Sequence, residues 1–123
     1  MNEILLYIAA GLALVTILVH SIVGEKRLIT PLVNSDHGVM EADLAKQVVR
    51  FAWHFTSIIG LIAVYILFDA ARDFAAADTA LLSITGGAFL IAGIYDAIAT
   101  RGKHIGWPLL AAAGFLTILT LYI

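Results

Sequence analysis

Four long apolar stretches follow one another along the chain, separated by short polar segments. They cover about residues 4–23, 48–68, 79–99 and 105–123. A helix needs about 20 predominantly apolar residues to cross the hydrocarbon core of a bilayer, and each stretch is close to that length. The pattern therefore predicts an all-α, multi-pass membrane protein: a four-helix up-down bundle that forms one domain over residues 1–123.

The composition agrees with this class and narrows the chemistry. Hydrophobic residues make up 62% of the chain and charged residues 13%, whereas a soluble domain carries about 25% charged residues. The absence of cysteine excludes disulfides, thiolate metal sites and covalently attached haem. The net charge of −2 does not point to any partner, and no feature of the sequence indicates nucleic acid. The leader Met-Asn-Glu has no positive region, so we expect the first span to be retained rather than cleaved.

Basic residues gather on one side of the predicted bundle. The connections 24–47 and 100–104 share that side, and cytoplasmic loops are enriched in Lys and Arg. We therefore expect a cell inner membrane protein with these connections in the cytoplasm and both termini on the non-cytoplasmic side. Trp53 and Trp107 fall near the cytoplasmic boundary as interfacial anchors. The six basic residues on this side are Lys26, Arg27, Lys46, Arg50, Arg101 and Lys103.

Start and stop signals divide the predicted helices. The first apolar run breaks at Gly24 into three charged residues. Ser35 or Asp36 can cap a helix that leads into the second span, and Asp78 can cap the third. Pro108 suits the first turn of the fourth.

A faint internal repeat relates the two halves of the chain. Residues 7–22 align with 83–98, and residues 53–62 align with 107–116, which places His20 opposite Asp96. Two copies of a helical hairpin, related by an axis along the membrane normal, would produce this pattern.

Polar side chains are expected to converge at the cytoplasmic end of the bundle. Membrane helices pack through small residues, and His20 shares a helix face with Ala9, Ala13 and Thr16. Asp96 similarly lies on a face of small residues in the third span. His20, His54, Asp96 and His104 all fall toward one end in an up-down arrangement, together with Glu25, Arg50, Arg101 and Lys103.

This cluster favours binding of a transition metal, either bare or as b-type haem. Imidazole and carboxylate are common metal ligands, and bundle interiors are common metal sites. For a bare ion, His20 and His54 would be ligands, joined by Asp96 or Glu25. His104 is a further candidate ligand, and Asp96 could instead accept the free ring N–H of a ligating histidine and so orient its imidazole.

For haem, His20 and His54 would be the axial ligands across antiparallel helices. Gly24 would make room for the ring, and Arg50, Arg27 or Lys26 could pair with the propionates. These two histidines resemble, in outline, the ligands of di-haem membrane cytochromes.

Two alternatives remain open. The chain could be a non-catalytic accessory subunit of a larger membrane complex, or a homo-oligomer, in which the cluster only joins helices. It could also be a small proton- or ion-coupled transporter, because ionisable residues inside membrane spans are often functional. No catalytic motif appears, so any enzymatic activity would be redox or metal-assisted chemistry at the membrane surface.

Overall fold

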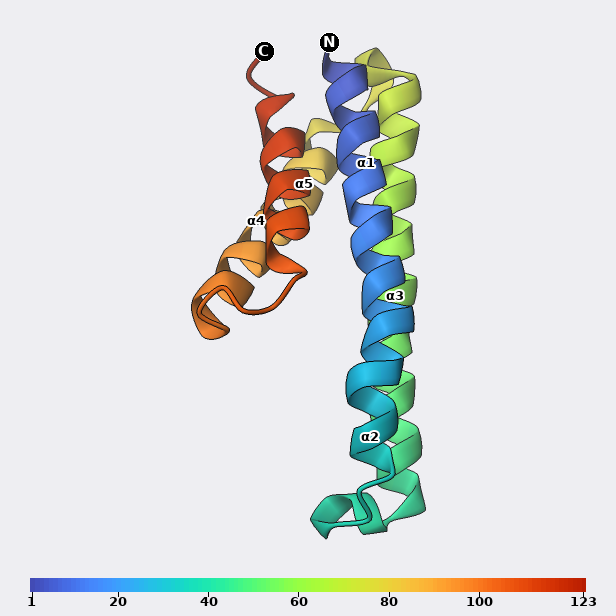
Figure 1. The fold of residues 1–123 in the computed structure, drawn as a ribbon. Helices are drawn as coiled ribbons and strands as arrows, with labels where there is room; N and C mark the ends of the chain where they lie inside the picture. Colours follow the sequence, from blue (N-terminus) through green and yellow to red (C-terminus); the bar gives the residue numbers. More distant parts are fainter.

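The computed structural model describes all 123 residues and contains helices and turns without any strand (Figure 1). Three helices are long and apolar enough to cross a membrane: a continuous helix Asn2–Val33, α3 (Asp43–Arg72) and α4 (Thr79–Ala99). These confirm an all-α chain of membrane-protein character. The last helix, α5 (Trp107–Leu119), has 13 residues and is shorter than the predicted span 105–123.

The first helix continues past Gly24 into the predicted connection 24–47. It consists of α1 (Asn2–Leu18), the π-helical turns η1 (Val19–Val23) and η2 (Glu25–Ile29), and α2 (Thr30–Val33). Gly24 itself has helical dihedrals, φ −63° and ψ −41°. Packing against α3 accompanies the helix through this region, and such tertiary contacts override a weak local stop signal.

The predicted helix caps are confirmed at two positions and wrong at a third. Asp78 accepts hydrogen bonds from the backbone N–H groups of Ala80 and Leu81, at 2.8 and 3.0 Å. Pro108 lies in the first turn of α5. By contrast, α3 starts after Ala42 without a side-chain cap, because the short 3-10 helix η3 (Gly38–Glu41) intervenes after the turn that contains Ser35 and Asp36.

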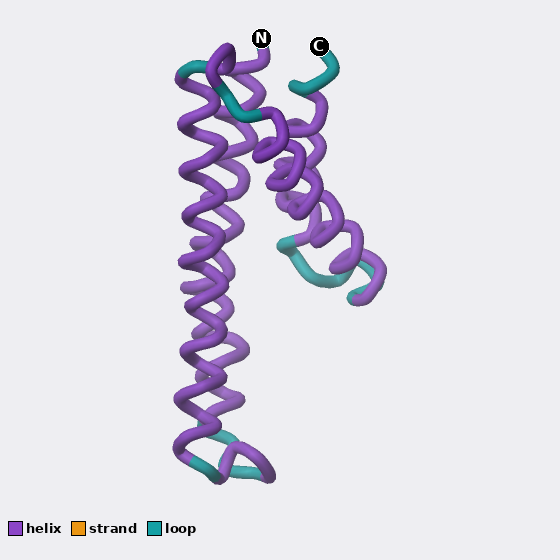
Figure 2. The backbone as a smooth tube through the Cα atoms, turned by 180° about the vertical axis from the view of Figure 1, so that it is seen from behind, coloured by secondary structure: helices purple, strands orange, loops and turns teal.

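The four main helices form two hairpins, and the predicted four-helix up-down bundle is not confirmed. α1 packs against α3, α4 packs against α5, and α5 also packs against α1, whereas α3 and α4 share little contact. Figures 1 and 2 show the hairpins meeting at the end that carries both chain termini and diverging toward the other end. We call this other end, with residues 24–50 and 100–106, the basic end, because it carries six of the seven Lys and Arg residues.

Small residues form the packed faces, as the sequence predicts. Ala9, Ala13 and Thr16 of α1 are buried. In the second hairpin, a Cβ added to Gly114 would lie 2.3 Å from the backbone nitrogen of Leu90, so α5 touches the backbone of α4. Such close approach is how small residues stabilise membrane helix pairs. The apolar core lies toward the end with the termini and consists of Leu6, Ala9, Ala10, Ala13, Leu67, Ala70, Ala71, Leu82 and Ala113.

Candidate functional site

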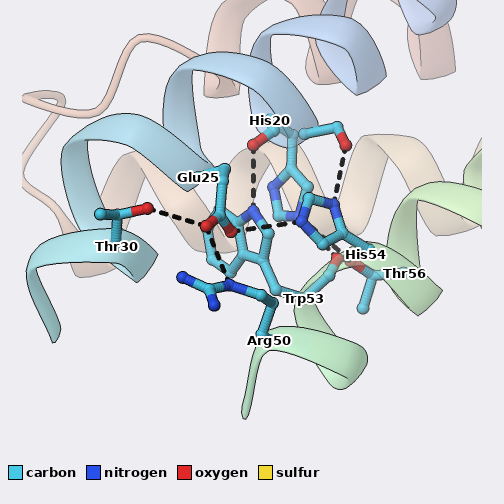
Figure 3. A network of polar contacts seen from close by, with 8 residues as sticks. His20, Glu25, Thr30, Arg50, Trp53, His54 and Thr56 are labelled. Atoms are coloured by element: carbon cyan, nitrogen blue, oxygen red, sulfur yellow. Dashed lines mark hydrogen bonds and ion pairs between the residues drawn. The ribbon is translucent and has the colours of Figure 1, made fainter. Parts of the chain in front are cut away.

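Glu25 is the centre of a polar network between the first helix and α3 (Figure 3). Its carboxylate accepts hydrogen bonds from Thr30 Oγ1 at 2.8 Å, Arg50 Nε at 2.9 Å and His54 Nε2 at 3.2 Å. Arg50 and His54 are four residues apart in α3, so they lie on one face of that helix. The continuation of the first helix beyond Gly24 places Glu25 opposite this face.

His54 is bound at both ring nitrogens. Its Nδ1 lies 2.9 Å from Ser21 Oγ, while its Nε2 faces Glu25. A carboxylate only accepts hydrogen bonds, so Nε2 carries a proton, and in the neutral ring Nδ1 accepts from the Ser21 hydroxyl. The imidazole thereby links Ser21 and Glu25, which lie one turn apart on the first helix.

His20 lies beside this network and is held by Trp53. The two rings stack with centroids 3.9 Å apart and planes 14° from parallel. Trp53 Nε1 donates to the His20 carbonyl oxygen at 3.1 Å. His20 Nε2 lies 3.0 Å from Thr56 Oγ1, whose own proton is donated to the Trp53 carbonyl oxygen at 2.6 Å. Nε2–H is therefore the donor to Thr56, and Nδ1 of His20 is left as an acceptor without a partner in the chain.

The space beside Gly24 is filled by the Trp53 side chain. A Cβ added to Gly24 would lie 2.4 Å from Cζ2 of the indole. The sequence predicts that Gly24 makes room for a haem ring; the ring that the structure places against Gly24 is the indole of Trp53. Trp53, predicted only as an interfacial anchor, is thus a site residue that sequence reasoning missed. The signal for it was Gly24, one helical turn beyond His20.

A second pair lies in the other hairpin, where His104 Nδ1 bonds with Asp96 Oδ2. Asp96 is in the last turn of α4, and His104 follows the helix end by five residues. Arg101 and Gly102 have positive φ angles, 52° and 73°, and the N–H of Gly102 bonds back to the Ala97 carbonyl oxygen at 2.8 Å. This helix-ending turn reverses the chain and returns His104 to Asp96.

The structure divides the predicted cluster into separate groups. Glu25, Arg50 and His54 bond together in the first hairpin, and Asp96 bonds with His104 in the second. No group of three or more His, Asp or Glu side chains has the geometry to hold a metal ion. The proposed ligand set for a bare ion is therefore not assembled in this conformation.

A cavity of about 290 Å³ nevertheless lies between the hairpins at the basic end. His20 and Trp53 line it from the first hairpin, and His104 lines it from the turn before α5. The Nε2 atom of His104, like Nδ1 of His20, has no hydrogen-bond partner within the chain. The remaining polar lining comes chiefly from Arg27 and Lys103.

A larger cavity, of about 570 Å³, lies near the opposite end of α3 and away from all four histidines. Its carboxylates include Asp73, which accepts from the Ala76 N–H at 3.3 Å, and Asp78, which caps α4. These carboxylates have structural roles at helix ends, and we assign no ligand site there.

In comparisons with known proteins, no family model, no curated protein and no solved structure matches the chain. The function is therefore inferred from the chain's own residues.

Proposed function

We propose that the chain is a small, non-catalytic, multi-pass membrane subunit in which the Glu25 network joins the helices of the first hairpin. The observation that carries this proposal is that the network is complete without a ligand. Glu25 receives three side-chain donors, and His54 is bound at both ring nitrogens. A polar network in which the carboxylate and the imidazole find their partners within the chain stabilises one arrangement of its helices.

The length of the first hairpin explains why such a network is needed. The helix that begins at Asn2 has 32 residues, and about 20 residues cross the hydrocarbon core. Roughly 12 residues, or about 18 Å of helix, therefore extend beyond the core. Glu25 lies in this extension, close to the bilayer boundary. Its hydrogen bonds to Arg50 and His54 hold the extension against α3.

The extension also offers a surface for a neighbouring subunit. Val39 and Leu44 at the tip of the hairpin are exposed by 75% and 72%. Leu28 and Val48 are exposed as well. Apolar side chains that project past the bilayer core support contact with another copy of the chain or with a larger membrane complex.

The topology that fits this proposal has four crossings in an inner membrane. Residues 105–123 would form the fourth crossing, with α5 as its regular part. Both termini would lie on the non-cytoplasmic side, and the basic end would lie in the cytoplasm. The gathering of Lys and Arg at one end supports this orientation.

A second candidate function is the binding of b-type haem. It is favoured by one observation: His20 and His104 line the same cavity, and each has a ring nitrogen without a partner. His104 bonds through its other nitrogen to Asp96, as metal-ligating histidines usually do with a carboxylate. Two imidazoles suit haem better than a bare tetrahedral ion, which takes four ligands. The candidate axial pair is then His20 and His104 rather than His20 and His54.

One experiment separates these candidates. The protein would be purified in mild detergent and examined by absorption spectroscopy, metal analysis and thermal unfolding, beside His54→Ala, His20→Ala and His104→Ala. For the non-catalytic subunit we expect a colourless, metal-free protein in which His54→Ala lowers the unfolding midpoint. His37→Ala, at an exposed turn position, is the control and should change nothing.

The opposite result has a distinct pattern. The wild type would show a Soret band or near-stoichiometric metal. His20→Ala and His104→Ala would both lose this signal but keep the unfolding midpoint of the apoprotein. That result would replace the joining role with haem binding as the proposed function. An unchanged midpoint in His54→Ala would contradict the joining role of the network.

A further inference from the structure

The cavity between the hairpins combines an apolar wall with a cationic rim. Val19 and Val23 of η1 and Leu110 of α5 supply apolar lining. Arg27 approaches from the first helix, and Lys103 approaches from the turn before α5. No Asp or Glu side chain lines the cavity, so its rim has positive charge without a local counter-charge.

The two rim cations are free of partners within the chain. The ion pairs that Lys and Arg form at the basic end join Lys46 to Asp36 and Arg50 to Glu25, and neither involves Arg27 or Lys103. Asp96, the carboxylate of the neighbouring helix end, is already bonded to His104. Two unpaired cations on opposite hairpins, facing one cavity, attract an anion that can bridge them.

The position of the cavity indicates what kind of anion fits. About 20 residues of the first helix cross the hydrocarbon core, so Val19 and Val23 lie at the edge of the core and Arg27 lies about one turn further out. An anionic group bound at the rim would be at headgroup depth. An apolar chain attached to it would run along Val19, Val23 and Leu110 toward the core. A free phosphate ion would leave this apolar wall unused.

We propose that this cavity binds an anionic phospholipid, with its phosphate between Arg27 and Lys103 and the start of its acyl chains against the apolar wall. Basic pockets between transmembrane helices bind anionic headgroups in this way. Arg is suited to the role because its guanidinium binds phosphate through two parallel hydrogen bonds. The inference uses residues outside the Glu25 network and is independent of the proposed joining role.

Trp53 provides a direct measurement, because it lines the cavity and is one of two tryptophans. A Trp107→Phe protein would be reconstituted in phosphatidylcholine vesicles that contain phosphatidylglycerol. One sample would carry bromine on the acyl chains of phosphatidylglycerol, and a second sample would carry it on those of phosphatidylcholine. Both samples would have the same bromine density. We expect brominated phosphatidylglycerol to quench Trp53 more strongly, with a roughly 30-fold preference for the anionic lipid, the order expected for two basic side chains at a membrane surface.

A matched pair of double variants tests the site itself. Arg27→Gln with Lys103→Gln removes the rim cations. Lys26→Gln with Arg101→Gln removes the same charge from the same two segments, at positions that do not line the cavity. The first should abolish the preference for phosphatidylglycerol, and the second should retain most of it. Equal loss in both doubles would reduce the effect to general surface charge and overturn the proposal, as would an unchanged preference in the first double.

Inorganic phosphate distinguishes the two sources of the anion. If the site takes a lipid, millimolar phosphate at constant ionic strength leaves the excess quenching unchanged. Complete reversal of the quenching by inorganic phosphate would identify a soluble phosphate as the better ligand and overturn the lipid proposal. Helical content, measured by circular dichroism for each variant, verifies that the compared proteins are folded.

Discussion

The imidazole of His20 lies flat against the indole of Trp53, with ring centroids 3.9 Å apart. The same two residues are also joined through the backbone, because Trp53 Nε1 donates to the carbonyl oxygen of His20 at 3.1 Å. This pair connects the first helix to α3 next to the Glu25 network. It also forms one side of the cavity between the hairpins. His20 is therefore part of a helix contact and of a candidate ligand site at the same time.

The first prediction concerns the glycine that admits the indole. Gly24→Ala should destabilise the protein by about 1–3 kcal/mol, the usual effect of overpacking. The reason is that its Cβ would lie 2.4 Å from Cζ2 of Trp53. Reversible unfolding in mixed micelles would measure the change. Gly11→Ala is the matched control, because a Cβ at Gly11 meets nothing within 4 Å. Equal stability of the two variants would show that the indole adjusts without loss.

The second prediction concerns the turn between α4 and α5. Asp96→Asn removes the charge that holds His104, so the backbone amides of residues 102–106 should exchange hydrogen faster while the global unfolding midpoint changes little. An exposed pair of this kind contributes about 0.2–1 kcal/mol. Hydrogen–deuterium exchange with mass spectrometry would measure the local effect. Asp69→Asn, an exposed carboxylate at the far end of α3, should leave the exchange of this turn unchanged. Unaltered exchange in Asp96→Asn would mean that Arg101 and Gly102 hold the turn by themselves.

The third prediction concerns the contact of α4 with α5. Gly114→Ala should destabilise the second hairpin by about 1–3 kcal/mol or more, since overpacking against a backbone is hard to relieve. Its Cβ would lie 2.3 Å from the Leu90 nitrogen and 2.6 Å from the Gly86 carbonyl oxygen. Gly87→Ala, where a Cβ meets nothing within 4 Å, is the control in the same hairpin. Unfolding in mixed micelles would compare them, and a smaller loss for Gly114→Ala than for Gly87→Ala would contradict the backbone contact.

The depth of the polar residues was predictable, but their partners were not. Counting residues from the predicted span ends places His20, His54, Asp96 and His104 toward one end of the bundle; in the structure His20 and His104 line one cavity, and His54 hydrogen-bonds with Ser21, the residue after His20. The partner of each depends on helix rotation and on how far apart the hairpins lie. Because the hairpins diverge at the basic end (Figures 1 and 2), Asp96 meets His104 of its own hairpin and not His54. The metal and haem hypotheses of the sequence stay predictions, and the internal repeat does as well.

The sequence by itself determined the all-α membrane class, the bounds of α4, the small-residue face around Ala9 and Ala13, and the Asp78 cap. These features depend on local hydrophobicity and on groups a few residues apart, so they can be predicted without the fold. Only the tertiary structure decided that the first helix continues through Gly24, that Trp53 fills the space beside it, and that the histidines divide between two hairpins. Each of these depends on contacts between residues distant in the chain, whose geometry is set by the packing of whole helices.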